Sequence, residues 1–311
     1  MGFIVLCLML LSGTALASGP EVVAYRSDAL PDQPQRIVTL DDLSTELAVS
    51  LGLRPIGVAN LAGYRRWVKL GSDQLDDAVA LGSSQQPNLE QLVSLKPDLI
   101  LGVASLHGAL FERLDALAPT LLWNVSLAPS SQDAVTKGEL MLNRLAGLTG
   151  RRAQVTQVLD RLQAALDEAE GVAEARGISD EPLAVLYPLT QQGLFIVSNE
   201  QTLVVSLANR LGGSNPWPLQ AGHSLHRRIE VNAVAHQPDL NLLFIGGFGQ
   251  SPFFESDLWQ ALPVAQHHRY GFLDTPYWSY GGPWSATVIV RQMADALRRM
   301  PGSSGDQGAS D

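Results

Sequence analysis

A long helical segment in the middle of the chain constrains the fold more than any other feature. Residues 132–149 and 151–176 are predicted to be helical with hardly a break, and the second segment repeats apolar residues at helical spacing, at Val155, Leu162 and Leu166. A helix over 151–176 would be roughly 39 Å long, much longer than a crossover between neighbouring strands requires. One interpretation packs it along a single domain. The more economical one joins two lobes, because strand–helix alternation resumes after it.

Short apolar runs alternate with amphipathic segments on both sides of this helix. Buried strands are predicted over 36–40, 54–60, 96–104 and 119–124, and the segment 78–82 is short and apolar. The same alternation resumes in the second half, in the segments 182–189, 194–198, 202–213, 238–248 and 269–276. Helices are predicted from a cap at Ser44 to Gly52, and over 88–95, 107–118 and 285–300. Strands that alternate with helices favour parallel α/β sheets.

The predicted fold class is therefore α/β, with two α/β lobes bridged by a single long helix. The first lobe is expected over 34–150, the interlobe helix over 151–176 and the second lobe over 180–300. The remaining residues, 301–311, lack apolar anchors and are predicted to be disordered. At 311 residues, the chain is long enough for two domains of ordinary size.

The first residues have the pattern of an export signal. A short apolar run precedes Ala15 and Ala17, which have the spacing of a signal-peptidase site. Residues 1–17 are therefore predicted to be a cleaved signal peptide, which places the mature protein in the periplasm. The only cysteine, Cys7, lies inside this leader and follows Leu6, where a lipoprotein site needs a small residue. We expect an exported protein without disulfides or thiolate chemistry.

The charge of the chain limits the classes of partner. Its formal net charge is −10, and no basic block interrupts the sequence. Nucleic acids and anionic membranes are both recognised through clustered positive charge. Neither is therefore expected as a partner.

Candidate catalytic motifs are incomplete. The segment "GHSLH" at 222–226 resembles a nucleophile elbow around Ser224, but His226 occupies the position where that turn needs a small residue. The glycine-rich turn at 246–252 lacks the third glycine of a dinucleotide loop. A metal site built from His223, His107 and carboxylates stays open, although no histidine pair has the spacing of a helical metal motif. A binding protein is the leading class, and a hydrolase using Ser224 is the enzyme alternative.

An aromatic cluster near the C-terminal end admits two interpretations. Residues 277–284 read "YWSYGGPW", whereas Phe, Trp and Tyr make up 6% of the whole chain. Two glycines and a proline show that this segment turns. It could form a packed corner at a domain edge, or a wall against which a flat or bulky ligand lies.

The ordered set of segments resembles a known family. "RIVTLDDLSTELAVSLGLRPIGVA", the G-x-x-x-x-P-N-L-E-x-L pattern at 82–92 and the W-x-Y-G pattern at 278–281 are similar to the periplasmic iron-siderophore-binding proteins of ABC importers. The resemblance is greatest to the ferric hydroxamate (ferrichrome-type) group and covers roughly residues 34–300. It implies two lobes bridged by one rigid helix, with the ligand in a shallow cleft between them.

This resemblance also implies a set of site residues. The siderophore already ligates the iron, so neither a cofactor nor protein metal ligands are expected. The ligand-binding candidates are Tyr64, Arg65, Trp67, Ser84, His107, Trp217, Trp278 and Tyr280. Ser84 stands where the hydroxamate binders carry a basic residue, so the kind of site carries over and the identity of the chelate does not. A corrinoid, haem or a bare divalent metal on the same scaffold is the alternative.

The expected protein partner is an inner-membrane ABC permease with its ATPase, and the binding protein itself is expected to be a monomer. In the family, one acidic residue on each lobe pairs with arginines of the permease. Glu90 falls on the position in the first lobe, and Glu230 lies near the position in the second. The alternative is that both belong to ordinary solvated helix faces.

Overall fold

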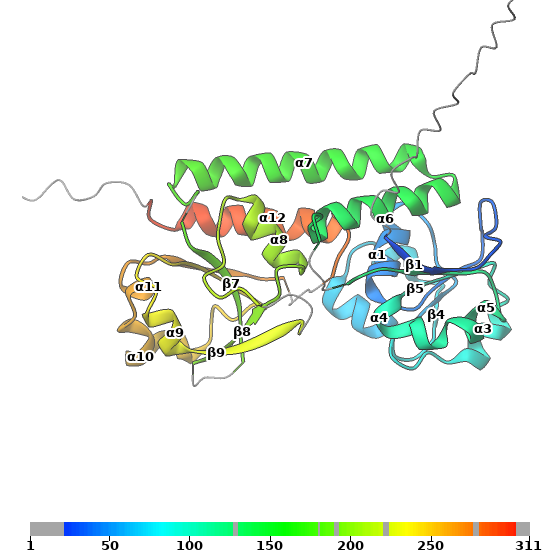
Figure 1. The fold of residues 1–311 in the computed structure, drawn as a ribbon, viewed down its shortest axis with the longest axis horizontal. Helices are drawn as coiled ribbons and strands as arrows, with labels where there is room; N and C mark the ends of the chain where they lie inside the picture. The colour runs from blue at the N-terminus through cyan, green and yellow to red at the C-terminus, as the bar shows by residue number, and fades with distance from the viewer. Residues whose placement is uncertain are drawn as a thin grey trace, which may run out of the picture.

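The computed structural model describes residues 22–126, 130–179, 181–189, 193–219, 224–275 and 280–302. The predicted signal peptide, the predicted disordered segment beyond residue 302, His223 and Trp278 lie outside these ranges. Two α/β lobes stand side by side, and α7 (Arg152–Ala175) runs across the top of both (Figure 1). The predicted fold class is confirmed.

The N-terminal lobe is built on a six-stranded sheet with the order β1-β6-β5-β2-β3-β4. Its strands are β1 (Val23–Arg26), β2 (Ile37–Thr39), β3 (Gly57–Val58), β4 (Val79–Ala80), β5 (Leu99–Val103) and β6 (Thr120–Trp123). All neighbours are parallel except β1, which runs antiparallel to β6 at one edge. The sequence reading did not predict β1, three of whose four residues are exposed.

Helices cover both faces of this sheet. They are α1 (Asp42–Ser50), α2 (Leu61–Gly63), the π-helix η1 (Tyr64–Val68), the 3₁₀ helices η2 (Ser72–Leu75) and η3 (Gly108–Leu110), α3 (Leu89–Leu95), α4 (Ala104–His107), α5 (Phe111–Asp115) and α6 (Ala134–Thr149). The predicted cap of α1 at Ser44 is wrong. Asp41 is the N-cap, and its carboxylate accepts a hydrogen bond from the Ser44 backbone N–H at 2.9 Å.

The C-terminal lobe has a five-stranded sheet with the order β11-β10-β7-β8-β9. The strands are β7 (Leu183–Pro188), β8 (Leu194–Ser198), β9 (His226–Glu230), β10 (Asn241–Ile245) and β11 (Tyr270–Leu273). The parallel prediction holds for β7, β10 and β11, whereas β8 is antiparallel to both of its neighbours. Strand β9 was missed because Ile229 is its only buried residue, so it has no apolar run.

The helices of this lobe are mostly short, apart from α12, which follows the aromatic segment. They are α8 (Leu203–Arg210), α9 (Val231–Ala235), the 3₁₀ helix η4 (Pro252–Glu255), α10 (Asp257–Gln260), α11 (Pro263–Gln266) and α12 (Pro283–Arg299). In the described ranges, no helix is long and apolar enough to cross a membrane.

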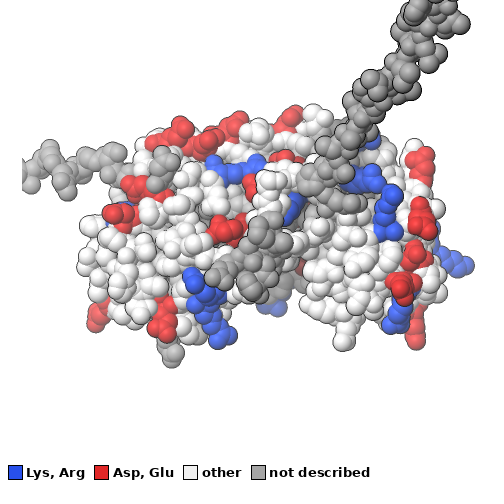
Figure 2. Space-filling view, in the orientation of Figure 1, with Lys and Arg blue, Asp and Glu red and all other residues white. Residues whose placement is uncertain are grey.

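Helix α7 packs into the cores of both lobes. Val155, near its start, is buried in the N-terminal core with residues of α1 and α6, whereas Leu162 and Leu166 are buried in the C-terminal core with residues of α12. The opposite face of α7 is acidic and exposed, and Figure 2 shows negatively charged side chains along this upper edge of the molecule. One continuous helix therefore holds two separate cores together, as its predicted length of 26 residues suggested.

Candidate ligand cleft

A cavity of about 520 Å³ lies between the lobes. The N-terminal lobe contributes Asp41, Asp42, Leu43, Asn60, Ser84, Gln85, Val103, Ser105 and Leu106, and the C-terminal lobe contributes Leu225 and Tyr280. Such a volume suits a small organic ligand or a compact chelate. The wall mixes carboxylates, amides and hydroxyls with aliphatic side chains.

The sheet topology explains why the cavity forms here. In the order β6-β5-β2-β3-β4, the chain adds β3 and β4 on one side of β2, and then β5 and β6 on the other side. The sheet therefore has a switch point between β2 and β5. Ligands of open parallel sheets bind outside the carboxyl ends of the strands at such a point. Asp41 follows β2 and Val103 ends β5, and both line the cavity.

Two adjacent carboxylates stand at this switch point. Asp41 caps α1 and accepts hydrogen bonds from the backbone N–H of Ser44 at 2.9 Å and from its hydroxyl at 2.7 Å. Both oxygens of Asp42 accept from the Asn60 side-chain amide at 3.2 Å. Burial raises the pKa of Asp41 above its ordinary value. Burial, together with the neighbouring charge of Asp41, raises the pKa of Asp42 to about 7.

His107 lies behind the cavity wall and holds part of it in place. Its side chain is fully buried. The Val103 backbone N–H donates to Nδ1 at 3.1 Å, so the proton of the ring is on Nε2, which donates to the Ser84 carbonyl oxygen at 2.8 Å. His107 thus bridges the end of β5 and the loop of Ser84, and its contact with a ligand stays a prediction. Ser84 itself lines the cavity, at 9% exposure.

Two of the predicted site residues are core residues. Tyr64 is fully buried, and its hydroxyl donates to the Leu70 carbonyl oxygen at 2.8 Å. Burial raises the pKa of this phenol, and the charges of Glu46 and Asp42 act in the same direction. Trp217 is 8% exposed and belongs to the aromatic core of the C-terminal lobe. Neither side chain is part of the cavity wall described above.

Arg65 and Trp67 lie outside the main cavity. Trp67 is half exposed and lines a separate hollow of about 30 Å³ with Thr275 and Ser285. The Arg66 guanidinium lies 4.5 Å from the centre of its ring. Arg65 donates to the Leu75 carbonyl oxygen at 2.9 Å. The structure therefore brings Ser84 and Tyr280 together in the cavity, whereas the cationic and aromatic side chains of η1 are not part of its described wall.

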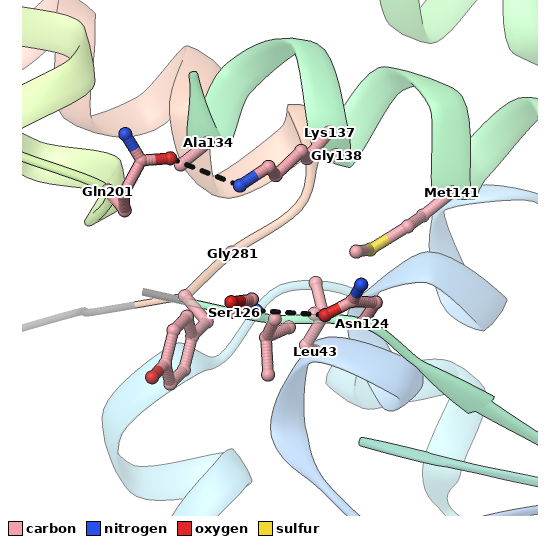
Figure 3. A pocket seen from close by; sticks show the side chains of 11 residues that line it. Leu43, Asn124, Ser126, Ala134, Lys137, Gly138, Met141, Gln201 and Gly281 are labelled. Atoms are coloured by element: carbon pink, nitrogen blue, oxygen red, sulfur yellow. Dashed lines mark hydrogen bonds between the residues drawn. The ribbon is translucent and has the colours of Figure 1, made fainter. Parts of the chain in front are cut away.

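Tyr280 and Leu43 also line a second, small pocket of about 20 Å³, in which α6 faces the C-terminal lobe (Figure 3). Lys137 extends from α6 and donates to the Gln201 side-chain oxygen at 3.1 Å, across the lobe boundary. Burial lowers the pKa of Lys137, and Asp133 opposes that shift. This ammonium is therefore held in a polar contact between the lobes.

The catalytic and metal alternatives find little support in the geometry. Ser224 is exposed, and its hydroxyl donates to the carbonyl oxygen of His226 at 3.1 Å. It precedes an edge strand, whereas a nucleophile elbow joins a strand to a helix. Within the described ranges, no group of three or more His, Cys, Asp or Glu side chains could hold a metal ion.

Sequence reasoning missed Asp41, Asp42 and Asn60. A signal was present, because "TLDD" places two carboxylates directly after a buried strand, and "GVAN" ends in a polar residue after the next one. The carboxyl ends of neighbouring parallel strands meet at one edge of a sheet. The pair of polar strand ends was therefore a candidate ligand site.

Two α/β lobes that share a backbone helix and enclose a cavity between them define a two-lobed solute-binding protein. The family model described as "Periplasmic binding protein" matches residues 37–276. The chain belongs to this family.

Several relatives cover most of the chain. The iron(3+)-hydroxamate-binding protein FhuD of Escherichia coli is 26% identical over 289 residues, which are 91% of this chain and 94% of the relative. The achromobactin-binding periplasmic protein of Dickeya dadantii is 34% identical over 282 residues, 88% of each chain. The Fe3+-Desferal-bound siderophore-binding protein FhuD of Vibrio cholerae has the same fold, with a TM-score of 0.73, 24% identity and coverage of 86% of this chain and 99% of that one.

Proposed function

We propose that this protein is the periplasmic substrate-binding component of an ABC importer, and that it captures a ferric siderophore for iron uptake. The cavity between the lobes carries this proposal, because it has the size and the position of a ligand site in a chain of this family. The names of the two sequence relatives support it, since one binds iron(3+)-hydroxamate and the other achromobactin.

The chemistry of the wall suits a preassembled chelate. Leu43, Val103, Leu106 and Leu225 offer aliphatic surface to the organic periphery of such a ligand, and Tyr280 adds an aromatic ring with a hydroxyl. Hydroxyls and amides around them provide hydrogen bonds to ligand oxygens. Because the siderophore supplies all ligands of its iron, the protein contributes shape and polarity and does not ligate the metal.

Ligand capture is expected to involve only a modest closure of the lobes. Helix α7 is continuous across both cores, so bending it would break backbone hydrogen bonds. The lobes also meet through Glu46 of α1, which accepts hydrogen bonds from Gly282 and Ser285 at the start of α12. Capture, docking on the permease and release would then proceed without a wide hinge motion.

A ligand panel tests the proposed function. We would measure quenching of intrinsic tryptophan fluorescence, confirmed by calorimetry, with ferric hydroxamate, catecholate and carboxylate siderophores, their iron-free forms, cobalamin, haem and Zn²⁺. Saturable binding of one ferric class at micromolar concentration or below, as is ordinary for specific recognition, is the expected result. Binding of cobalamin, haem or Zn²⁺ alone would keep the fold and overturn the siderophore assignment.

Matched tyrosine variants locate the site. Tyr280→Ala removes an aromatic side chain from the cavity, whereas Tyr25→Ala removes an exposed one from β1, outside the cavity. Tyr280→Ala is expected to weaken binding at least about tenfold, the loss of one aromatic contact, and Tyr25→Ala to leave it unchanged. Equal affinities in both variants would place the ligand elsewhere.

A further inference from the structure

We propose that the cleft selects ferric chelates with a pendant cationic group, and that Asp41 and Asp42 are the side chains that make this selection. The inference rests on the proposed function and names the class of siderophore that this site takes. It depends on which charged residues line the cavity, which hydrogen-bond partners their carboxylates already have, and which other titratable groups lie near them.

The cavity wall is acidic at its switch point. Asp41 and Asp42 are the charged residues of the described wall, and none of the lining residues is Lys or Arg. The internal segments outside the described ranges do not supply such a residue either, because 127–129, 180, 190–192, 220–223 and 276–279 contain no Lys or Arg in their sequence. The described wall therefore offers no lysine or arginine to pair with these carboxylates.

The basic side chains near the boundary are placed elsewhere. Lys137 is bonded to Gln201 in the small pocket beside the cavity. Arg65 donates to a backbone oxygen of its own lobe and lies 3.7 Å from Asp76. Arg227 and Arg228 follow Leu225 in the chain but are exposed on β9 and are not part of the described cavity wall.

Asp42 has unused capacity to bind a cation. Each of its oxygens accepts one hydrogen bond, at 3.2 Å, and both bonds come from the same amide nitrogen of Asn60. A carboxylate has about four acceptor positions, so Asp42, which lines the cavity, keeps acceptor capacity for a ligand. Asp41 also accepts one bond on each oxygen, both from Ser44, but it is the more deeply buried of the two, at 5% exposure.

The neighbours of Asp42 add to its need for a positive partner. Asp41 raises the pKa of Asp42 along with burial. The other titratable groups near this turn are His107, which opposes the rise in the pKa of Asp41, and Tyr64, whose own pKa is raised by the charges of Glu46 and Asp42. A partly buried carboxylate beside a second carboxylate is stabilised when a cation pairs with it, since the pair then recovers part of the lost solvation.

Charge separates the classes of ferric chelate. Three hydroxamates neutralise one ferric ion, so a trihydroxamate with a pendant ammonium is a cation. Ferric tris-catecholates and ferric citrate complexes carry net negative charge. An anion near these two acidic side chains opposes their ionisation and is repelled where they are ionised. An ammonium, by contrast, favours the ionised form of Asp42, whose pKa is about 7 in the ligand-free protein, and gains a charge-assisted hydrogen bond with it. The lining aliphatic side chains accommodate the hydroxamate core in either case.

Three derivatives of one chelate test the inference. Ferric desferrioxamine B carries a pendant ammonium, its N-acetyl derivative is neutral and its N-succinyl derivative is anionic, all around the same iron core. We expect the affinity to fall in that order, with the cation bound at least about tenfold more tightly than the acetyl form, since one partly desolvated ion pair is worth about that factor. Equal affinities, or tightest binding of the anion, would overturn the inference.

Variants assign the effect to Asp42. Asp42→Asn is expected to reduce the ratio between the cationic and acetyl affinities to less than about threefold. Asp77→Asn, which removes the same charge from an exposed position outside the cavity, is expected to preserve the ratio. Should Asp42→Asn fold poorly, added salt on the wild-type protein provides a second readout, because it must weaken binding of the cation and not of the acetyl form. A ratio insensitive to both would refute the role of Asp42.

The outcomes separate this inference from the proposed function. If anionic ferric chelates bind and all three desferrioxamine complexes do not, the protein is a siderophore-binding protein and the charge selection is wrong. If no ferric chelate of any class binds, the proposed function itself fails. Binding of the cationic complex with the expected order supports both.

Discussion

The Glu46 carboxylate accepts hydrogen bonds from the backbone N–H of Ser285 at 2.7 Å and from its hydroxyl at 2.6 Å, although the two residues belong to different lobes. The Gly282 backbone N–H donates to the same carboxylate at 2.9 Å. Glu46 is fully buried, and burial raises its pKa against the opposing effect of these donors. A side chain of α1 thus caps α12, whose own N-cap residue, Gly282, has no side chain to do so.

Glu46→Gln should destabilise the protein and loosen the lobe interface. One oxygen is replaced by an NH₂ group that faces N–H donors, so buried donors lose their acceptor, at a cost of about 2–4 kcal/mol. Urea unfolding measures this cost. Glu112→Gln on the exposed face of α5 is the control and should change stability by less than about 0.5 kcal/mol. Equal effects of the two substitutions would show that the cap is unimportant.

Asp42 should make the stability of the ligand-free protein depend on pH. Its pKa is raised from 3.8 to about 7, so the folded state holds this proton more tightly than the unfolded state does. The stability contributed by the proton is fully present below about pH 4 and is lost as the pH rises through 7. Because the pKa rises from 3.8 to about 7, Asp42→Asn should be about 4 kcal/mol more stable than the wild type at pH 8 and about equal at pH 4. Thermal melts across this range check the prediction, and parallel curves for both proteins would contradict it.

His107 should be essential for the shape of the cavity. His107→Ala removes the acceptor of the Val103 N–H and the donor to the Ser84 carbonyl, and it leaves a void, so a loss of about 2–4 kcal/mol is expected. Ligand affinity should fall as well, because the Ser84 loop loses its support. The exposed His267 offers a control, since its replacement by Ala should alter neither quantity. An unchanged melting temperature in His107→Ala would disprove the bridge.

Ser224→Ala should leave ligand affinity within about twofold of the wild type, as for most exposed side chains, because the hydroxyl is bonded only to the nearby His226 carbonyl in the described structure. The same variant tests the hydrolase alternative, since a nucleophilic serine would be required for turnover of an ester substrate. Hydrolysis by the wild type that disappears in Ser224→Ala would show an enzymatic activity.

Glu90 and Glu230 should affect transport without affecting binding. Both are exposed, Glu90 on α3 and Glu230 just before α9, and these helices lie on the side of the two lobes away from α7 (Figure 1). Reversing both charges with arginine should lower uptake through the permease severalfold, since exposed charges mainly orient docking, and leave the affinity for the ligand as it was. Normal uptake by the double variant would assign these residues to an ordinary solvated surface.

Much of the fold was predictable because it depends on local periodicity. The apolar runs that became β2, β5, β6, β7 and β10 are buried strands, and the segment 151–176 is the long helix. The exposed strands β1 and β9 were not predictable in this way, because a strand with few buried residues has no apolar signature. The domain boundaries expected from the sequence remain predictions.

The site was less predictable, because residues of the same type in similar local sequence became either core residues or cavity residues, and only the packing of the folded chain decided which. Tyr64 and Tyr280 were both predicted to be aromatic ligand contacts. Tyr64 is buried, with its hydroxyl bonded to the Leu70 carbonyl oxygen, whereas Tyr280 lines the cavity. The aromatic segment that the sequence singled out could be a corner or a ligand wall. Within that segment, Tyr280 lines the cavity wall. Trp278 lies outside the described ranges and remains a predicted ligand contact.

By itself, the sequence determined the α/β alternation, the helix long enough to span two cores and the absence of a basic block, because each follows from residue order, spacing and composition. Only the tertiary structure decided that Glu46 caps α12 and that Asp41 and Asp42 face a cavity without a cationic side chain among its described lining residues. The reason is physical. Burial and charge complementarity depend on which segments, more than 200 residues apart in the case of Glu46 and Ser285, come within hydrogen-bonding distance, and local pattern carries no information about that.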